Sequence, residues 1–269
     1  MGSIQINIEA NEEQQDILIS QLSDLGAEGF EQTDNDLIAY FNENLFKAYE
    51  INDLLQNYSF TSHILAEKNW NEEWESNFQP VIVNKFCAIR AEFHKPVINE
   101  VEHEIIITPK MSFGTGHHAT TYMMVEQMQK IDFKNKTVFD FGTGTGILSI
   151  LSEKLGASDI VAIDVDEWSF ANAQENIEKN QCSKISVILS SQIPTEKFDV
   201  VLANINRNVI LNYLPALNQS LKEKGCLLLS GLLAADEKDI LNACLKEKLN
   251  LVNLVERNTW ISLLFNKGL

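Results

Sequence analysis

The chain has 269 residues, of which 45% are hydrophobic and 22% are charged, and its formal net charge is −17. This length suits one large domain or two smaller ones, and the composition is that of a soluble globular protein. No apolar run approaches the ~18 residues of a membrane-spanning helix, and the N-terminal stretch MGSIQINIEANEEQQ lacks the features of a signal peptide. The four cysteines form no C-x-x-C pair. We therefore expect a cytoplasmic protein with reduced thiols and no membrane contact.

Nearly all of the negative charge lies in the first 80 residues. They contain 16 acidic and two basic residues, a balance of −14, whereas residues 81–269 contain 22 acidic and 19 basic residues, a balance of −3. Such an acidic region repels nucleic acid phosphates and attracts a basic partner. A surface that only keeps the protein soluble is the alternative, and charge alone does not separate the two.

The N-terminal region predicts a small α+β unit. Apolar and polar residues alternate over 3–9, which indicates a strand, and apolar residues recur at helical spacing over 12–25, just before Gly26. Two strands are expected around the turn-like TDND within 28–43, and 49–58 has the pattern of a second helix. The expected order is therefore β-α-β-β-α.

A helix is expected to connect this unit, taken as residues 1–62, to the rest of the chain. Within 63–80, the run AEKNWNEEWESNFQ places Trp70 and Trp74 on one helical face. Packing of both tryptophans against a domain is the simplest role for them. The segments VIVNKFCAIRAEF and EIIIT follow and predict short strands that lead into a second domain.

Residues 81–269 predict a doubly wound α/β domain. Helical patterns separate the strand-like segments TVFDF, DIVAID, ISVIL, KFDVVLANI and CLLLSG. One long helix is expected to run through NVILNYLPALNQSLKEKG and to end at Gly225, and the last two strands, LNLVNLVERN and TWISLLFNK, to form a hairpin. Apolar strands that alternate with helices indicate a parallel sheet covered on both faces. We expect a seven-stranded, Rossmann-like sheet.

The segment VFDFGTGTGIL has the features of a cofactor loop. It follows a predicted strand and opens a helix, and Gly142, Gly144 and Gly146 let the backbone turn sharply and approach a ligand closely. The spacing is G-x-G-x-G rather than the G-x-G-x-x-G of dinucleotide-binding loops. Asp140, at the strand end, is placed to hold an ammonium group directly or through water. These features favour S-adenosylmethionine over NAD, because S-adenosylmethionine has an amino-acid tail and no pyrophosphate.

Two later strand ends add polar groups to the same site. Asp164 lies 22 residues after Gly142, where a carboxylate accepts hydrogen bonds from ribose hydroxyls, and Asp166 is expected near the adenine. Asn204 ends the KFDVVLANI strand, so its side-chain oxygen is placed to accept a hydrogen bond from an attacking amine. Taken singly, each aspartate is equally a helix N-cap and Asn204 a turn residue.

Several motifs resemble those of the bacterial ribosomal protein L-eleven methyltransferases, and the resemblance covers essentially the whole chain. The segment MSFGTGHHATT at 111–121 resembles the family's M-A-F-G-T-G-T-H-P-T-T, which is its most specific motif. The cofactor loop resembles D-x-G-C-G-S-G, and the strand that ends at Asn204 carries the family's A-N-I. The N-W-x-x-x-W-E run and the F-x-P after it resemble the family's linker.

The resemblance implies a protein-lysine N-methyltransferase that depends on S-adenosylmethionine. Its substrate would be a basic large-subunit ribosomal protein, methylated at lysine side chains and at the N-terminal amine. The acidic N-terminal unit would be a ferredoxin-like domain that recognises this substrate. The 111–121 segment would fold over the methionine end of the cofactor, through contacts of Phe113, Gly114, Thr115 and Thr121. Asn204 would face the sulfonium as one of the cofactor-binding residues and would orient the attacking amine.

The chain also departs from the family's motifs, chiefly at these positions: Thr143, Thr145, His117, Ala119, Asn206 and Arg207. We therefore expect a looser 111–121 segment and an altered substrate side. The adjacent histidines have no cysteine or acidic cluster beside them, so a metal site is not expected. Three alternatives remain from the residues: an NAD-linked oxidoreductase, a methyltransferase for a small amine or a glutamine side chain, and a cofactor-binding adaptor without turnover. The oligomeric expectation is a monomer.

Overall fold

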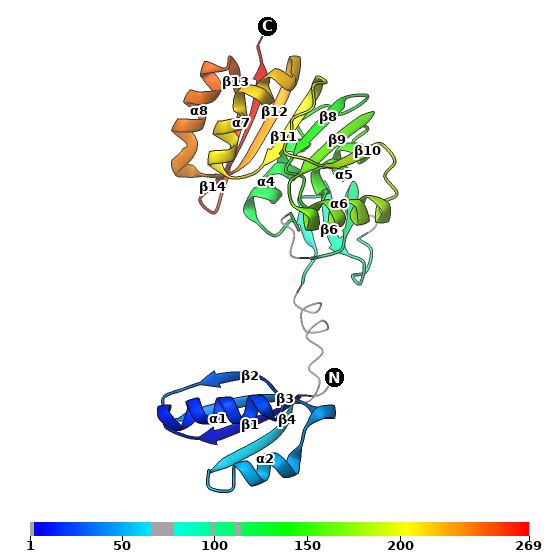
Figure 1. Ribbon diagram of the computed structural model, residues 1–269. Helices are drawn as coiled ribbons and strands as arrows, with labels where there is room; N and C mark the ends of the chain where they lie inside the picture. Colours follow the sequence, from blue (N-terminus) through cyan, green and yellow to red (C-terminus); the bar gives the residue numbers. More distant parts are fainter. Residues whose placement is uncertain (1–2, 66–77, 98–99, 111–113, 269) are drawn as a thin grey trace. The chain divides into compact units, whose positions relative to one another are not determined.

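The computed structural model describes residues 3–65, 78–97, 100–110 and 114–268 (Figure 1). The chain divides into two compact units, Met1–Phe78 and Gln79–Leu269. The expected linker tryptophans and Phe113 lie outside the described residues. Among the helices of the described part, none is long and apolar enough to cross a membrane.

The N-terminal unit is a four-stranded antiparallel sheet with two helices. Its elements are β1 (Ser3–Glu9), α1 (Glu12–Asp24), β2 (Ala27–Gln32), β3 (Asp36–Asn42), η1 (Glu43–Leu45), α2 (Ala48–Leu54) and β4 (Phe60–Leu65). The strand order β2-β3-β1-β4 is that of a ferredoxin-like fold, which confirms that expectation. The strand β4 is absent from the order expected from the sequence. It pairs with β1, so the fold continues beyond residue 62.

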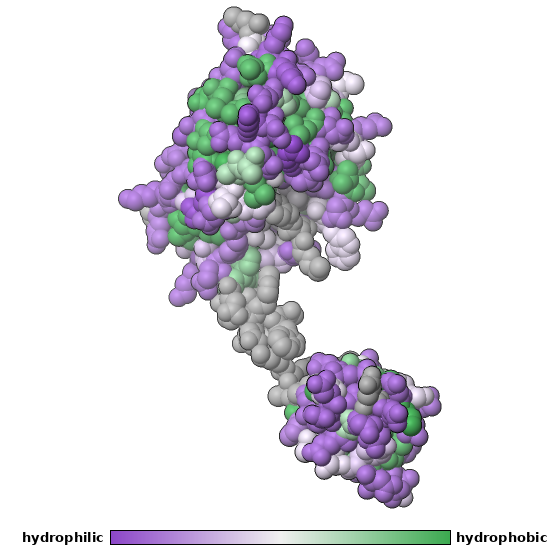
Figure 2. Space-filling model, turned by 90° about the vertical axis from the view of Figure 1, so that its left-hand side faces the viewer, coloured by the Kyte–Doolittle hydropathy of each residue, from purple (hydrophilic) through white to green (hydrophobic). Residues whose placement is uncertain are grey.

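Two periodic patterns build the core of this unit. Ile4, Ile6 and Ile8 alternate along β1 and are buried, and they belong to one cluster with Leu18 and Leu22, which lie one helical turn apart on α1. The polar positions between them face outward. On the face that Figure 2 shows, the surface of this unit is mostly hydrophilic.

The second unit contains a seven-stranded sheet with the order β10-β9-β8-β11-β12-β14-β13. Its elements, with those of a separate three-stranded sheet β5-β6-β7, are β5 (Val81–Val83), β6 (Cys87–Ala91), β7 (His103–Ile107), α4 (Ala119–Met128), β8 (Thr137–Phe141), α5 (Ile147–Lys154), β9 (Asp159–Asp164), α6 (Glu167–Lys179), β10 (Ile185–Leu189), β11 (Phe198–Asn204), α7 (Arg207–Ser220), β12 (Leu221–Leu233), η2 (Ala234–Asp236), α8 (Glu237–Lys246), β13 (Leu249–Arg257) and β14 (Trp260–Lys267). β14 runs antiparallel to both β12 and β13, whereas the other pairs of neighbouring strands in this sheet are parallel. The expected doubly wound sheet is therefore confirmed.

Helices cover both faces of this sheet (Figure 1). One face packs against α7 and α8 in a single apolar cluster, and α4, α5 and α6 lie against the other face. The chain runs outward from β8 to β9 and β10, then returns to place β11 on the other side of β8. Ligands of such sheets bind where the strand order reverses, outside the carboxyl ends of the strands. The fold thus directs attention to the ends of β8 and β11.

One helix is shorter than the sequence pattern indicates. The expectation that it runs to Gly225 is wrong, because α7 ends at Ser220 and β12 begins at the next residue. Extended backbone there buries Leu221 opposite Phe198 and brings Lys222 Nζ to 2.8 Å from Asp199. These pairings with β11 outweigh the helix propensity of the Leu-Lys-Glu-Lys sequence.

Candidate active site

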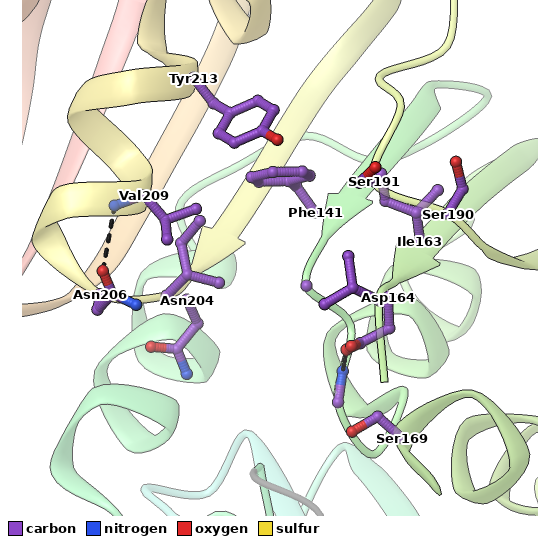
Figure 3. A pocket seen from close by; sticks show the side chains of 14 residues that line it. Phe141, Ile163, Asp164, Ser169, Ser190, Ser191, Asn204, Asn206, Val209 and Tyr213 are labelled. Carbon is purple, nitrogen blue, oxygen red and sulfur yellow. Dashed lines mark hydrogen bonds between the residues drawn. The ribbon is translucent and has the colours of Figure 1, made fainter. Parts of the chain in front are cut away.

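A cavity of about 460 Å³ lies at the carboxyl ends of the central strands, at the point where the strand order reverses (Figure 3). It is lined by Phe141, Gly142, Gly144, Ile163, Asp164, Val165, Ser169, Ser190, Ser191, Asn204, Ile205, Asn206, Val209 and Tyr213. Apolar walls with a few convergent polar groups are typical of a small-molecule site, and this volume is within the usual range.

The glycine loop between β8 and α5 forms one wall of the cavity. Gly142, Gly144 and Gly146 have φ angles of 76°, 56° and 80°, in the left-handed region that glycine adopts without strain. A Cβ on Gly142 would lie 2.6 Å from Cγ2 of Ile205, so only glycine fits there. Gly142 and Gly144 line the cavity, and Gly146 is the N-cap of α5. The loop therefore has the backbone form that the sequence predicted.

Asp164 is positioned by this loop and lines the cavity. Its Oδ2 accepts a hydrogen bond of 2.9 Å from the Gly144 amide, and its Oδ1 accepts one of 3.0 Å from the Asp166 amide (the Gly144 bond is dashed in Figure 3). Each carboxylate oxygen can accept a second hydrogen bond. The carboxylate thus keeps capacity for ligand hydroxyls.

The position of Asp166 differs from that of Asp164. Its side chain is exposed, is absent from the cavity lining, and accepts a 2.8 Å hydrogen bond from the Ser169 amide as the N-cap of α6. The N-cap interpretation is therefore confirmed. Contact with an adenine stays a prediction.

Asp140 is fully buried behind the loop and is not among the cavity-lining residues. Its Oδ2 accepts hydrogen bonds from Ser149 Oγ at 2.6 Å and Thr143 Oγ1 at 2.7 Å. Burial raises the pKa of this carboxyl group to about 6, although the two hydroxyl donors act in the opposite direction. Its Oδ1 has no partner among the described residues.

Asn204 lies on the opposite wall and bonds to Thr121, which lies outside the cavity lining and is 83 positions away in the chain. Asn204 Nδ2 donates to Thr121 Oγ1 at 3.3 Å, which fixes the amide orientation. The Asn204 Oδ1 atom is buried and has no partner within the described part of the chain. A buried acceptor without a donor costs free energy. This oxygen is therefore suited to a hydrogen-bond donor on a bound molecule.

The first glycine-rich segment touches the second. Thr145, between Gly144 and Gly146, donates from its Oγ1 to the Gly114 carbonyl at 2.8 Å. Thr115 hydrogen-bonds through its Oγ1 to His117 Nδ1 at 3.2 Å and is not among the lining residues. Neither Gly114 nor Thr121 is among them, so the structure brings Gly114 to the loop and Thr121 to Asn204 without placing either on the cavity wall.

The two adjacent histidines have different partners. His117 Nε2 lies 2.9 Å from the Gln79 carbonyl, whereas His118 Nδ1 lies 2.8 Å from Thr120 Oγ1 at the start of α4. A search of the described residues finds no group of three or more His, Cys, Asp or Glu side chains that could hold a metal ion.

Comparison with known proteins identifies the family. The model of the family described as ribosomal protein L11 methyltransferase (PrmA) matches residues 2–268. The chain belongs to this family. A ribosomal protein L11 methyltransferase from Porphyromonas gingivalis is 39% identical over 262 residues, which cover 93% of this chain and 90% of that protein. One from Chlorobaculum tepidum is 36% identical over 277 residues and covers 97% of this chain and 95% of its own.

Solved structures agree with this assignment. The crystal structure of the ribosomal protein L11 methylase from Lactobacillus delbrueckii subsp. bulgaricus has a TM-score of 0.66 and 28% identity, covering 71% of this chain and 100% of that one. A methyltransferase from Pyrococcus furiosus, at 20% identity and a TM-score of 0.51, covers 61% of this chain and 90% of its own and supports the fold alone. The protein is a class I methyltransferase that uses S-adenosylmethionine.

The cavity of this L11 methyltransferase family member fits that cofactor. Gly142 leaves no room for a Cβ where the loop approaches the cavity, and Asp164 offers acceptors to hydroxyl groups. Phe141 and Ile163 supply apolar walls, against which an adenine base could pack. Asn204 also lines this cavity, and its buried Oδ1 has no partner among the described residues.

Sequence reasoning missed some of the lining residues. Ser190 and Ser191 follow the end of β10, and the Ser190 amide donates to the Asp164 carbonyl at 2.8 Å. The strand-end rule applied to ISVIL would have identified both serines. Tyr213 lies in α7, and its ring packs 5.0 Å from that of Phe141. No sequence signal marks Tyr213, because only the packing of α7 on the sheet brings it to the cavity.

Proposed function

We propose that this enzyme transfers methyl groups from S-adenosylmethionine to amino groups of ribosomal protein L11, at lysine side chains and at the N-terminal amine. The observation that carries the proposal is that Asn204 lines the cavity beside the glycine loop and has a buried Oδ1 with no partner among the described residues. The names of relatives that align over more than nine tenths of this chain support the substrate.

S-adenosylmethionine supplies an electrophilic methyl group on a sulfonium centre. We propose that the carboxylate of Asp164 accepts hydrogen bonds from the ribose hydroxyls and that the backbone at Gly142 and Gly144 closes against the cofactor. Asp140 is proposed to hold the ammonium group of the amino-acid tail through water, because its carboxylate lies behind the loop. Asp166 is the proposed contact near the adenine.

The same segment that touches the loop is proposed to cover the methionine end of the cofactor, through Phe113, Gly114, Thr115 and Thr121. The support for this role is the 2.8 Å hydrogen bond between Thr145 and the Gly114 carbonyl, and the hydrogen bond between Thr121 and Asn204. Phe113 enters the proposal on the sequence motif alone.

The chain's contribution to the reaction is desolvation and alignment of the amine. A lysine in water has a pKa near ~10.4, so its neutral, nucleophilic form is scarce at neutral pH. Apolar walls such as Phe141 and Val209 favour the neutral amine by excluding water. Asn204 Oδ1 accepts one N–H of this amine and so directs its lone pair, while the bond to Thr121 holds the amide in place. We assign no general base.

The acidic N-terminal unit is proposed to recognise the basic ribosomal protein. It carries a balance of −14 over the first 80 residues, and acidic side chains such as Asp16, Asp24 and Glu28 are exposed. Charge complementarity of this kind steers association and gives specificity. We propose a cytoplasmic monomer that binds no nucleic acid directly.

Incubation with labelled S-adenosylmethionine and purified ribosomal protein L11, read by intact mass, tests the proposal. We expect L11 to gain mass in multiples of one methyl group. In Asn204→Ala we expect kcat/KM to fall about 100-fold or more, because the amine loses its acceptor, with cofactor binding retained. Asn218→Ala is the matched control, since Asn218 also has an unpartnered buried Oδ1 but bonds to Glu247, outside the cavity lining.

Cofactor binding without labelled L11 would overturn the substrate and leave the methyltransferase fold standing. The adaptor alternative predicts that result for every protein tested. Equal losses in Asn204→Ala and Asn218→Ala would contradict the role given to Asn204.

A further inference from the structure

Asn172 and Asn176 of α6, together with its C-cap residue Asn180, bond to backbone groups along the free edge of β7 and of the residue that follows it. Asn180 accepts from the Ile106 amide at 3.0 Å and donates to the Ile106 carbonyl at 2.6 Å. Asn176 accepts from the Thr108 amide at 2.7 Å, and Asn172 donates to the Thr108 carbonyl at 3.2 Å. β7 lies at the edge of its sheet, and the side-chain amides of these asparagines bond to backbone groups that would otherwise pair with a further strand. We call Asn172, Asn176 and Asn180 the asparagine ladder.

The geometry of helix and strand explains the fit. Side chains four apart on a helix share a face and are separated by about 6 Å along its axis, and alternate residues of a strand are about 6.6 Å apart. The ladder therefore matches Ile106, in β7, and Thr108, which directly follows the strand. Asn172 and Asn176 are fully buried, which keeps water from these bonds.

One residue of the asparagine ladder, Asn176, also bonds to the cofactor loop. Asn176 Nδ2 donates to the Thr145 carbonyl at 2.8 Å, while its Oδ1 accepts from Thr108. Thr145 lies between Gly144 and Gly146, and its hydroxyl holds the Gly114 carbonyl. Asn176 thus bonds to Thr108, which precedes the family's most specific motif, and Thr145 bonds to Gly114, which lies within that motif. Within the ladder, the structure shows no bond from Asn172 or Asn180 to the loop.

We propose that Asn176 is a positioning residue for the cofactor loop, which fixes the peptide between Thr145 and Gly146 relative to β7. The proposal rests on the proposed use of this loop for S-adenosylmethionine. The loop needs such a restraint, because glycines on either side of Thr145 leave its backbone a wide choice of conformations. The other ladder residues secure β7 and leave the loop unaffected.

Asn176→Asp and Asn180→Asp, made in the full chain, form a matched pair. Each substitution keeps an acceptor for a backbone amide, that of Thr108 or of Ile106. Asn176→Asp removes the donor to the Thr145 carbonyl, whereas Asn180→Asp removes the donor to the Ile106 and Asn176 carbonyls. Only Asn176→Asp removes the bond to the loop. The readout is the Kd of S-adenosylhomocysteine by calorimetry, which involves no methyl transfer, measured well below each variant's melting temperature. We expect Asn176→Asp to raise this Kd about tenfold or more, and Asn180→Asp to change it less than twofold.

A Kd for Asn176→Asp within twofold of the wild type would overturn the proposal, as would equal increases in both variants. Should Asn176→Asp fail to fold, Asn176→Ser is judged by the same criterion, because serine is small and neutral but too short to span both bonds. Methylation of L11 by the wild type is measured separately. Its absence would end the L11 proposal and leave the comparison of the two variants valid.

Discussion

Asn204 and Asp140 both carry a buried oxygen without a partner among the described residues, yet their surroundings differ. Asn204 lines the cavity, so a bound molecule can satisfy its oxygen. Asp140 lies behind the glycine loop, where Thr143 and Ser149 hold its other oxygen. At the scale of single residues, Asn204 is the proposed contact for the substrate amine, and Asp140, which accepts a hydrogen bond from Thr143 of the loop, is the proposed water-mediated contact for the cofactor's ammonium group.

The raised pKa of Asp140 predicts a pH-dependent stability. The folded protein has a pKa of about 6 at this carboxyl against 3.8 for the unfolded chain, so it retains a proton that the unfolded chain releases. Stability therefore falls as pH rises from about 4 through 6, by on the order of 3 kcal/mol in total. Asp140→Asn removes this loss. We expect the melting temperature of the variant, relative to that of the wild type, to increase as the pH rises from 4 to 7.

Asp199 provides a control of opposite sign. Burial acts to raise the pKa of Asp199, but hydrogen bonds from Lys222 and Thr137 outweigh it and lower the pKa. Its contribution is therefore present above the unfolded pKa and lost as pH falls. The melting temperature of Asp199→Asn, relative to that of the wild type, should decrease as pH rises. A pH-independent difference for Asp140→Asn would show that the carboxyl has an ordinary pKa in the folded protein.

At the scale of elements, a bulge in β12 supports the cavity wall. The register of β12 against β14 shifts between Leu229 and Leu232, and Gly231 within this shift has a φ of 85°. A Cβ on Gly231 would overlap the carbonyl of Ile205, which lines the cavity after β11. The bulge thus lets β12 approach closely to the segment that follows β11, at the wall of the cavity.

Gly231→Ala should therefore damage both stability and the site. The new methyl group must displace the Ile205 backbone, which we expect to cost about 2–4 kcal/mol and to lower the melting temperature by several degrees. Displaced Ile205 should also weaken cofactor binding, measured by calorimetry. Gly156→Ala is the control, because Gly156 has a φ of 99° but its Cβ would meet nothing closer than 3.6 Å. If the two variants bind the cofactor equally, the bulge does not support the site.

For the whole molecule, charge separates the two units. The N-terminal unit is acidic on a folded, hydrophilic surface, and the rest of the chain is nearly balanced. This division supports the proposal that the first unit recognises the protein substrate and the second binds the cofactor. We therefore expect salt to weaken the binding of the protein substrate and to leave the binding of the cofactor almost unchanged.

Raising NaCl from about 50 to about 300 mM should increase the KM for L11 several-fold and change the cofactor Kd less than twofold, because salt screens exposed charges and hardly affects an enclosed site. Neutralising three exposed acids of the first unit should also raise this KM: Glu13→Gln, Glu28→Gln and Asp34→Asn. The control neutralises three exposed acids of the second unit: Glu196→Gln, Glu223→Gln and Glu256→Gln. Equal effects of the two triple variants on the KM for L11 would show that the charge of the first unit serves solubility and not substrate recognition.

The sequence by itself determined the seven strands, the glycine loop and the strand-end positions of Asp164 and Asn204. Each of these follows from local periodicity, from glycine spacing or from the rule that ligands bind at the carboxyl ends of strands. The family's motifs identified the enzyme class for the same reason, since they are contiguous in the chain.

Only the tertiary structure decided how distant residues meet. It ended α7 at Ser220, buried Asp140, brought Tyr213 to the cavity and joined Asn176 to the loop. Each outcome depends on packing or hydrogen bonds between segments far apart in the chain, for which no local pattern exists. Sequence periodicity specifies which face of an element is buried, and the partner of that face is settled when the elements pack together.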